Sequence, residues 1–319
     1  SRLKMLELAF SDYEDVVVSD YEVKKEGLSY TYETLRAINE AYRPDRIYFL
    51  VGTDMLFDFP TWRYPEKILS SATLFVTRRE DEDEKKAEEF YCSRFQKPLR
   101  LSSYTGKNVS GTEVRSRLAL GLDCSSFLDE KVYSFIKENG LYSEGKLGKF
   151  VRDSLTQKRL VHTSNVMTLA VRYARRLKEN ADEAFLAAML HDCAKYLNPS
   201  DYGFSYPSVP EPVVHQFLGA DILAKFYGVT DLNVLNAVRY HTTGRAGMST
   251  LEKIVFLADL LEKDRVFPGV ETLRSAVEED FERGFAIAVN ELYGFLSSGG
   301  KEVYYLTKEC RDFYDAANK

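Results

Sequence analysis

The sequence lacks the cysteine patterns that are typical of disulfide-bonded extracellular proteins and of proteins with structural zinc sites. Its 319 residues contain four cysteines, and no two of them form a CxxC pair. A disulfide framework or a cysteine-based zinc site is therefore not expected, and a reducing, cytoplasmic setting fits best. The four are Cys92, Cys124, Cys193 and Cys310.

The chain also lacks a long apolar run and a marked excess of charge. No segment reaches the roughly 18 apolar residues that a membrane helix needs, since the longest candidate, residues 251–261, contains Glu252, Lys253 and Asp259. With 43 basic and 49 acidic side chains the net charge is −6, so no strongly basic face is expected. Membrane and nucleic-acid partners are therefore not expected. Small anionic substrates, which need only a local basic pocket, remain compatible, and a homodimer stays open.

The length predicts about two domains, and the first half alternates strand-like and helix-like segments. Apolar strand patterns cover residues 15–19, 46–52 and 72–77, and helical patterns cover residues 2–9, 31–42, 65–70, 112–120 and 129–139. Residues 81–89 are dense in charge, as in a solvated loop or helix face. Alternating strands and helices predict an α/β domain with a Rossmann-type, mainly parallel sheet over residues 1–145.

The second half has helical periodicity and no convincing strand pattern. A linker is predicted at residues 143–148, which contain two glycines and mixed charge. The helical segments that follow are residues 155–178, 182–197, 213–227, 232–240, 250–261 and 270–296. The sequence therefore predicts an all-α domain over residues 146–319.

All the histidines of the chain lie in this second half. Asp192 directly follows one of them, and Asp259 interrupts an otherwise apolar helix, where an unpaired carboxylate would be costly. Imidazole and carboxylate ligands without thiolate suit Fe, Mn, Zn, Co or Ni. Two metals that share a carboxylate can activate water and clamp a phosphoryl group. The histidines are His162, His191, His215 and His241.

The order His, His-Asp, His, His, Asp resembles the HD-domain metal-dependent phosphohydrolases, and specifically their bacterial YqeK-type branch. The matching stretches are residues 158–163 (KRLVHT), 190–195 (LHDCAK), 240–248 (YHTTGRAGM), 251–259 (LEKIVFLAD) and 267–270 (FPGV). This resemblance implies symmetrical hydrolysis of diadenosine tetraphosphate to two ADP at a dinuclear centre. Iron is the metal that it favours, and Mn, Co, Ni and Zn stay open.

The same resemblance implies a role for each polar residue of the motif. One metal would be held by His162, His191, Asp192 and Asp259, and Asp192 would bridge to a second metal held by His215 and His241. Lys195 would act beside Asp192 in catalysis and would bind phosphate. Arg245 and Arg265 are further phosphate-binding candidates, and ordinary surface charge is the structural alternative for all three cationic residues. One departure is Gln216, which stands where the family more often has glycine.

Three polar clusters stand out in the first half: Ser29–Thr31, Gly52–Asp54 and Val109–Arg115. Ligands of open parallel sheets bind beyond the carboxyl ends of the strands, where Gly52–Asp54 is expected. Ser110 and Thr112 precede a predicted helix, whose free N–H groups favour phosphate, and Arg115 follows one turn later. A plain helix cap at Ser110 and core packing of Trp62, the only tryptophan, are the structural alternatives.

Together these clusters resemble the nicotinate-nucleotide adenylyltransferases, which are α/β nucleotidyltransferases that join ATP and nicotinate mononucleotide. The resemblance implies nicotinate-nucleotide contacts from Thr31, Gly52, Asp54, Trp62 and Arg63. It implies ATP contacts from Ser110, Thr112 and Arg115. Gly111 stands where that family usually has a second serine.

The first half differs from that family at its beginning. No His-x-Gly-His element for ATP is present, and the chain opens on Ser1 inside a helical pattern. We therefore expect a missing amino-terminal segment and no adenylate transfer by the chain as written. Two alternatives stay open. The first half could be a non-catalytic nucleotide-binding module beside an HD domain that acts on another phosphorylated nucleotide, or the dinuclear centre could perform oxygen chemistry.

Overall fold

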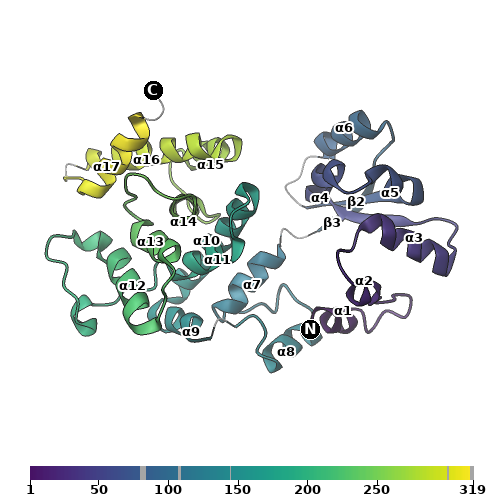
Figure 1. Ribbon diagram of the computed structural model, residues 1–319, viewed down its shortest axis with the longest axis horizontal. Coiled ribbons are helices and arrows are strands. Elements are labelled where there is room, and N and C mark those ends of the chain that lie inside the picture. The colour runs from purple at the N-terminus through teal and green to yellow at the C-terminus, as the bar shows by residue number, and fades with distance from the viewer. Residues whose placement is uncertain (80–83, 107–108, 144, 300–301, 317–319) are drawn as a thin grey trace. The chain divides into compact units, whose positions relative to one another are not determined.

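The computed structural model describes residues 1–79, 84–106, 109–143, 145–299 and 302–316 (Figure 1). They form two compact units, Ser1–Val109 and Ser110–Lys319. The sequence places its domain boundary at residues 145–146, whereas the compact units divide before helix α7 (Gly111–Ala119). The reason is that α7 packs along α10 (Gln157–Leu177), a helix of the second unit.

The first unit contains the α/β arrangement that the sequence predicts. Its three strands form a parallel sheet in the order β1-β2-β3, and Tyr48 of β1 is in register with Thr73 of β2. Its apolar core includes Leu35, Val51 and Phe59. The elements are α1 (Arg2–Ala9), α2 (Tyr21–Lys24), α3 (Thr31–Tyr42), β1 (Tyr48–Gly52), α4 (Thr53–Asp58), η1 (Phe59–Thr61), α5 (Pro65–Ser71), β2 (Thr73–Arg79), α6 (Glu84–Phe95) and β3 (Arg100–Gly106).

Two strand assignments in this unit differ from the sequence expectation. The strand predicted at residues 15–19 is wrong: the segment is irregular, and Val16 and Val17 are 42% and 75% exposed. A strand needs a neighbour for its backbone hydrogen bonds, and this run pairs with none of the three described strands. Conversely, β3 carries no apolar run and forms because β2 offers it a pairing edge.

The second unit is all-helical over its described residues, as predicted. Its apolar core is a cluster of buried side chains contributed by residues between Ala119 and Tyr314. It includes most of the apolar side chains of the central helices. The elements are α7, α8 (Glu130–Glu138), α9 (Gly145–Ser154), α10, α11 (Ala181–Leu190), η2 (Pro199–Tyr202), α12 (Glu211–Tyr227), α13 (Leu232–Tyr240), α14 (Thr250–Leu261), α15 (Val270–Glu279), α16 (Phe281–Ser298) and α17 (Tyr305–Ala316). No described helix has the length and apolar character needed to cross a membrane.

Several helix boundaries in this unit correct the sequence expectation. The predicted linker at residues 143–148 instead contains the start of α9, whose Phe150 and Val151 are buried; residue 144 lies outside the described part. The predicted helix 182–197 ends at Leu190. The predicted helix 270–296 breaks at Asp280, whose side chain accepts a hydrogen bond from Arg283 N and so starts α16. Helix α17 was not predicted.

Candidate metal centre

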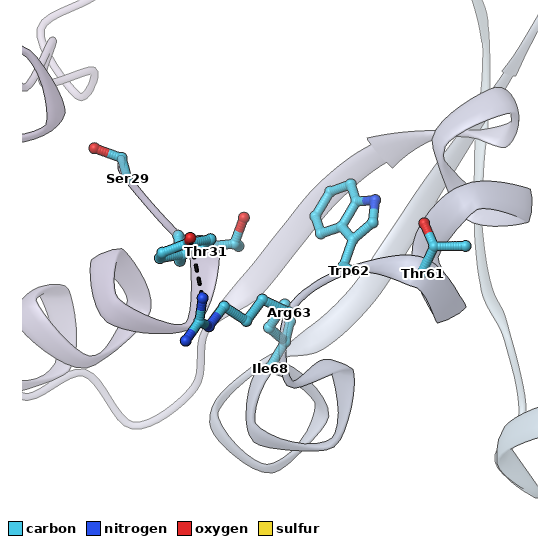
Figure 2. A pocket seen from close by; sticks show the side chains of 7 residues that line it. Ser29, Thr31, Thr61, Trp62, Arg63 and Ile68 are labelled. Carbon is cyan, nitrogen blue, oxygen red and sulfur yellow. Dashed lines mark hydrogen bonds between the residues drawn. The ribbon is translucent and has the colours of Figure 1, made fainter. Parts of the chain in front are cut away.

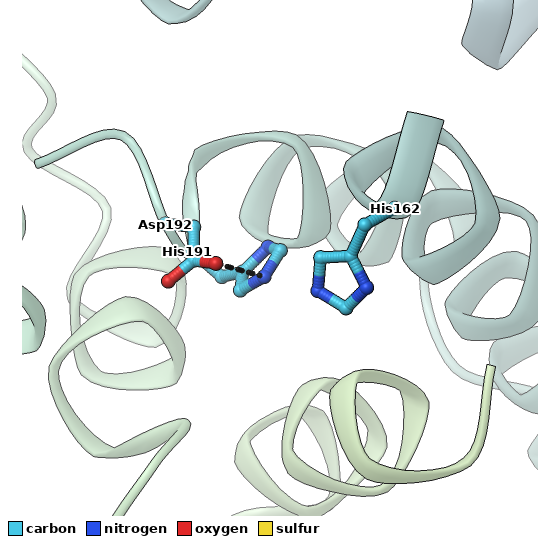
Figure 3. Close-up of side chains that lie close together, drawn as sticks. All are labelled: His162, His191 and Asp192. Atoms are coloured by element: carbon cyan, nitrogen blue, oxygen red, sulfur yellow. Dashed lines mark ion pairs between the residues drawn. The ribbon is translucent and has the colours of Figure 1, made fainter. Parts of the chain in front are cut away.

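Five helices of the second unit bring the predicted ligands to one place. His191 and Asp192 lie at the end of α11, where the helix stops and the chain turns. The imidazole of His162 faces them from α10 (Figure 3). The remaining ligands come from α12 (His215), the end of α13 (His241) and α14 (Asp259).

The ligand atoms form three overlapping groups, each with its atoms within 4.8 Å of one another. Asp192 belongs to two of them: one contains His162 and His191, and the other contains His215 and His241. The third group joins His191 and His241 to Asp259. The two oxygens of Asp192 face different histidines, with Oδ2 3.4 Å from His191 Nε2 and Oδ1 3.3 Å from His215 Nε2. One carboxylate therefore directs its two oxygens toward two different groups of histidines.

Backbone and carboxylate acceptors fix the tautomers of three histidines. Nδ1–H of His191 donates to Ala188 O at 2.7 Å, and Nδ1–H of His241 donates to Val238 O at 2.8 Å. Nδ1–H of His162 donates to Glu262 Oε1 at 3.0 Å. A carbonyl or ionised carboxyl oxygen only accepts, so in the neutral form of each ring the lone pair is on Nε2. That pattern is typical of histidines that ligate metal through Nε2.

Two of these Nε2 atoms are buried and lack a hydrogen-bond partner in the described structure: those of His162 and His191. His162 Nε2 lies 3.0 Å from Asp259 Oδ1, but the approach does not have hydrogen-bond geometry. Buried polar atoms without partners are costly, and here the unpaired lone pairs converge on carboxylate oxygens. The donor set therefore fits divalent metal.

The electrostatics of the cluster keep its carboxylates ionised. Burial alone would raise the pKa of Asp192, but its contacts with His191, His215 and His241 hold that pKa well below its usual value. The pKa of Asp259 is likewise lowered, against burial, by His162 and His191. Burial, with His241 and Lys195 nearby, lowers the pKa of His215 to about 4, so the ring of this predicted ligand is neutral near pH 7.

His162 is the exception among the histidines. Burial opposes its charged form, yet the carboxylates of Asp259 and Glu262 raise its pKa above the ordinary value. A metal that binds Nε2 of His162 must displace this proton. Metal affinity is therefore expected to rise with pH until His162 is neutral.

The predicted cationic residues occupy three different positions. Lys195 Nζ lies 3.1 Å from His215 Nε2 and 3.9 Å from Asp192 Oδ1, at the cluster itself. Arg265 Nη2 lies 2.6 Å from Asp259 Oδ1, where it supports a ligand. Arg245 is paired with buried Glu252 at 2.8 Å and has no contact with the cluster in the described structure.

Three residues of the site carried no signal strong enough to be predicted from the sequence. Glu262 holds His162 and also accepts from Asn165 Nδ2 at 3.0 Å. Arg159 pairs with Asp192. Gln216 Oε1 accepts from the backbone N–H groups of Thr242 and Thr243, next to His241. Glu262 and Arg159 lie three residues from a predicted ligand, and i, i+3 spacing along a helix could have suggested both.

Replacing Glu262 with glutamine is expected to weaken metal binding by ~10–100-fold, because the carboxylate orients the His162 ring. The loss of its charge also lowers the pKa of His162, so binding should release fewer protons near neutral pH. Competition with a chelator at several pH values measures both effects. Exposed Glu179, which follows α10, provides a matched Glu→Gln control expected to bind metal as the wild type does. Equal affinities for the two variants would contradict this role for Glu262.

In the first unit, a pocket of about 290 Å³ gathers part of the predicted nicotinate-nucleotide site. Its lining includes Thr31, Trp62 and Arg63, and Arg63 Nη1 donates to Tyr30 Oη at 3.1 Å (Figure 2). Trp62 also packs against Phe49 and Phe59, so it serves the core as well as the pocket. Gly52 ends β1 outside the lining, and Asp54 follows in α4, where its side chain lies outside the described part.

The predicted ATP-contacting residues lie on α7, within the second unit. Ser110 caps the helix by accepting from Glu113 N at 3.0 Å. The Thr112 hydroxyl is buried and accepts from Arg115 Nη2 at 3.1 Å and from Arg175 Nη1 of α10 at 3.3 Å. The structure therefore brings Thr112 and Arg115 together, and it adds Arg175 to them.

Comparison with known proteins matches each half of the chain to a family. Residues 159–264 match the HD domain, and residues 1–117 match the cytidylyltransferase-like family. A symmetrical bis(5'-nucleosyl)-tetraphosphatase of Bacillus subtilis is 32% identical over 48% of this chain and 88% of its own length. A crystal structure of a predicted HD superfamily hydrolase involved in NAD metabolism, from Clostridium acetobutylicum, is 32% identical. The alignment with this crystal structure covers 55% of our chain and 98% of the crystallised chain, and the TM-score is 0.51.

One relative spans both halves. A probable nicotinate-nucleotide adenylyltransferase/Ap4A hydrolase of Mycoplasma genitalium is 28% identical over 96% of this chain and 81% of its own length. The HD domain implies divalent-metal binding, which the ligand cluster described above fits. The chain belongs to the cytidylyltransferase-like family in its first half and, in its second, to the HD-domain family of the symmetrical bis(5'-nucleosyl)-tetraphosphatases.

Proposed function

We propose that the second half hydrolyses diadenosine tetraphosphate symmetrically to two ADP at a dinuclear metal centre. The observation that carries this proposal is the position of Asp192, which lies in two histidine groups and turns one oxygen toward each. One metal would be held by His162, His191, Asp192 and Asp259, and the other by Asp192, His215 and His241. Iron is proposed first, although this donor set also accepts Mn, Co, Ni and Zn.

When bound, such a metal pair supplies an activated water and neutralises phosphoryl charge. Side chains of the protein would orient the ligands and stabilise charge on the substrate. The fixed Nδ1–H donors hold three imidazoles in the ligating tautomer. Lys195, 28% exposed, presents a positive charge beside Asp192 and His215, where charge develops on the phosphate oxygens. The four free cysteines suit a cytoplasmic setting, in which nucleotide substrates are found.

Anaerobic turnover of diadenosine tetraphosphate by metal-replete protein, with the products separated by chromatography, tests this function. ADP as the sole product would support symmetrical cleavage. AMP with ATP would keep a phosphohydrolase and reject the symmetrical assignment. Absence of turnover with two metals bound would contradict the proposal and favour another phosphorylated substrate or oxygen chemistry.

For the first half, we propose a nucleotide site of the adenylyltransferase type that takes nicotinate mononucleotide in the pocket beside Trp62 and Arg63. The guanidinium of Arg63 lies over the Tyr30 ring, 4.6 Å from its centroid, which places a cation beside an aromatic face. Such a pair suits a ligand with a phosphate and a flat ring. Separately, Ser110, Thr112 and Arg115 of the second unit are proposed contacts for ATP phosphates, on the resemblance alone.

Nicotinate mononucleotide is expected to change the fluorescence of this chain, because Trp62 is its only tryptophan and lines the pocket. The change should saturate, and Arg63→Met should weaken binding by ~10-fold or more, since a hydrogen bond to a charged group contributes about 1.5–3 kcal/mol. The control is Arg36→Met, which removes one positive charge at an exposed position of α3. A titration in which the ligand leaves Trp62 emission unchanged would count against the pocket.

A further inference from the structure

Arg159 stands at the metal centre without an assigned role. It lies in the first turn of α10, where Thr156 caps the helix and its hydroxyl accepts from Arg159 N at 3.3 Å. The residue is one turn before His162, so the two side chains share a face of the helix. This position brings Arg159 Nη1 to 2.9 Å from Asp192 Oδ2.

The Arg159 guanidinium is partly exposed to solvent, although it contacts the buried cluster. The Asp192 side chain is 2% exposed, whereas that of Arg159 is 25% exposed. A guanidinium has five N–H donors, and among the described residues this one forms an ion pair with Asp192. Donors therefore remain for an anion that approaches Asp192 from the solvent side.

The other cations of the site are placed differently. Lys195 approaches Asp192 Oδ1, the oxygen opposite to the one that Arg159 contacts. Arg265 and Arg245 are engaged with Asp259 and Glu252. Arg159 and Lys195 thus flank the one carboxylate that lies in two histidine groups, and an anion bound over Asp192 would meet both.

We propose that Arg159 binds the phosphate chain of the substrate at the solvent-facing side of the metal cluster. The planar fork of a guanidinium matches two oxygens of a phosphate, which a lysine cannot reproduce. The ligand class is a nucleoside polyphosphate, and the inference rests on the phosphohydrolase function proposed above.

The test uses ADP as a probe, measured by calorimetry on the full chain loaded with metal. Arg159→Met should raise the dissociation constant of ADP by ~10–100-fold, the range expected for hydrogen bonds to a charged group. Arg159→Lys should recover only part of this loss. Exposed Lys158→Met removes the same charge from the neighbouring residue and should bind ADP as the wild type does.

Metal content and steady-state kinetics separate the possible outcomes. The proposal requires that Arg159→Met keep its metal and show a raised KM for diadenosine tetraphosphate. Loss of metal, or unchanged ADP binding, would overturn it and leave Arg159 as a counter-ion for Asp192. If the wild type binds ADP through Arg159 but does not cleave diadenosine tetraphosphate, the phosphate contact stands and the proposed substrate fails.

Discussion

Replacing Asp192 with asparagine is expected to abolish metal-pair binding and to lower hydrolysis of diadenosine tetraphosphate by at least about a thousandfold, or ~4 kcal/mol in activation free energy. Asp192 is the residue common to the His162–His191 and His215–His241 groups. An amide lacks the negative charge and can offer a metal only one oxygen, so the two groups lose their shared ligand. Metal analysis should find no more than one ion per chain.

Two controls distinguish this result from misfolding. Asp192 is also the buried anion for Arg159 and Lys195, so its loss changes stability as well as chemistry. Thermal unfolding of the metal-free proteins measures that part separately. Asp201→Asn, at an exposed position of η2, makes the same change of charge away from the cluster and should retain both metal and activity. Wild-type turnover by Asp192→Asn would reject the shared-carboxylate assignment.

Replacing Gly284 with alanine should destabilise the second unit by ~3 kcal/mol, which lowers its melting temperature by roughly 6–12 °C. Gly284 lies on α16 where this helix crosses α15. A Cβ atom at this position would stand 2.5 Å from Val277 Cα and 2.6 Å from Val277 N. Backbone atoms cannot rotate away as a side chain does, so the helices must separate and open the packing around buried Val277.

Gly294→Ala supplies the matched comparison on the same helix. A Cβ there meets nothing within 4 Å, so the substitution should be neutral or stabilising by up to about 1 kcal/mol through helix propensity. Calorimetric melting of the two variants measures the difference. If the two variants have the same melting temperature, the close approach of α15 and α16 does not limit the stability of the second unit.

Part of the predicted ligand set carries a local signal in the sequence, and the rest follows from the family resemblance of the motif order. His191 and Asp192 end an apolar run, and Asp259 interrupts an apolar helix. Such exceptions to apolar periodicity need a compensating partner wherever the helix is buried. The supporting residues are different: Glu262 and Gln216 are ordinary polar residues whose importance depends on partners 100 and 26 residues away.

The same distinction explains the errors in secondary structure. The predicted helix 270–296 carries continuous apolar periodicity, but α15 and α16 must fold back on each other, and Asp280 caps the second helix. The run at residues 15–19 has strand-like residues and no strand to pair with among those described. β3 has little strand signal and is formed by its neighbour. Strand pairing and the packing of consecutive helices on each other involve residues far apart in the sequence, so a local sequence pattern does not predict them.

Local patterns in the chain predict the two fold classes, the helical character of the second half and the residue types of the candidate metal centre. The contacts between helices give what these patterns do not contain: which oxygen of Asp192 faces which histidine, the ion pair of Arg245 with Glu252, and the contact of Arg159 with Asp192. The packing of α7 with the second unit is likewise a tertiary contact. The physical reason is that periodicity reports burial along one element, whereas ligand geometry and charge pairing depend on how separate elements meet.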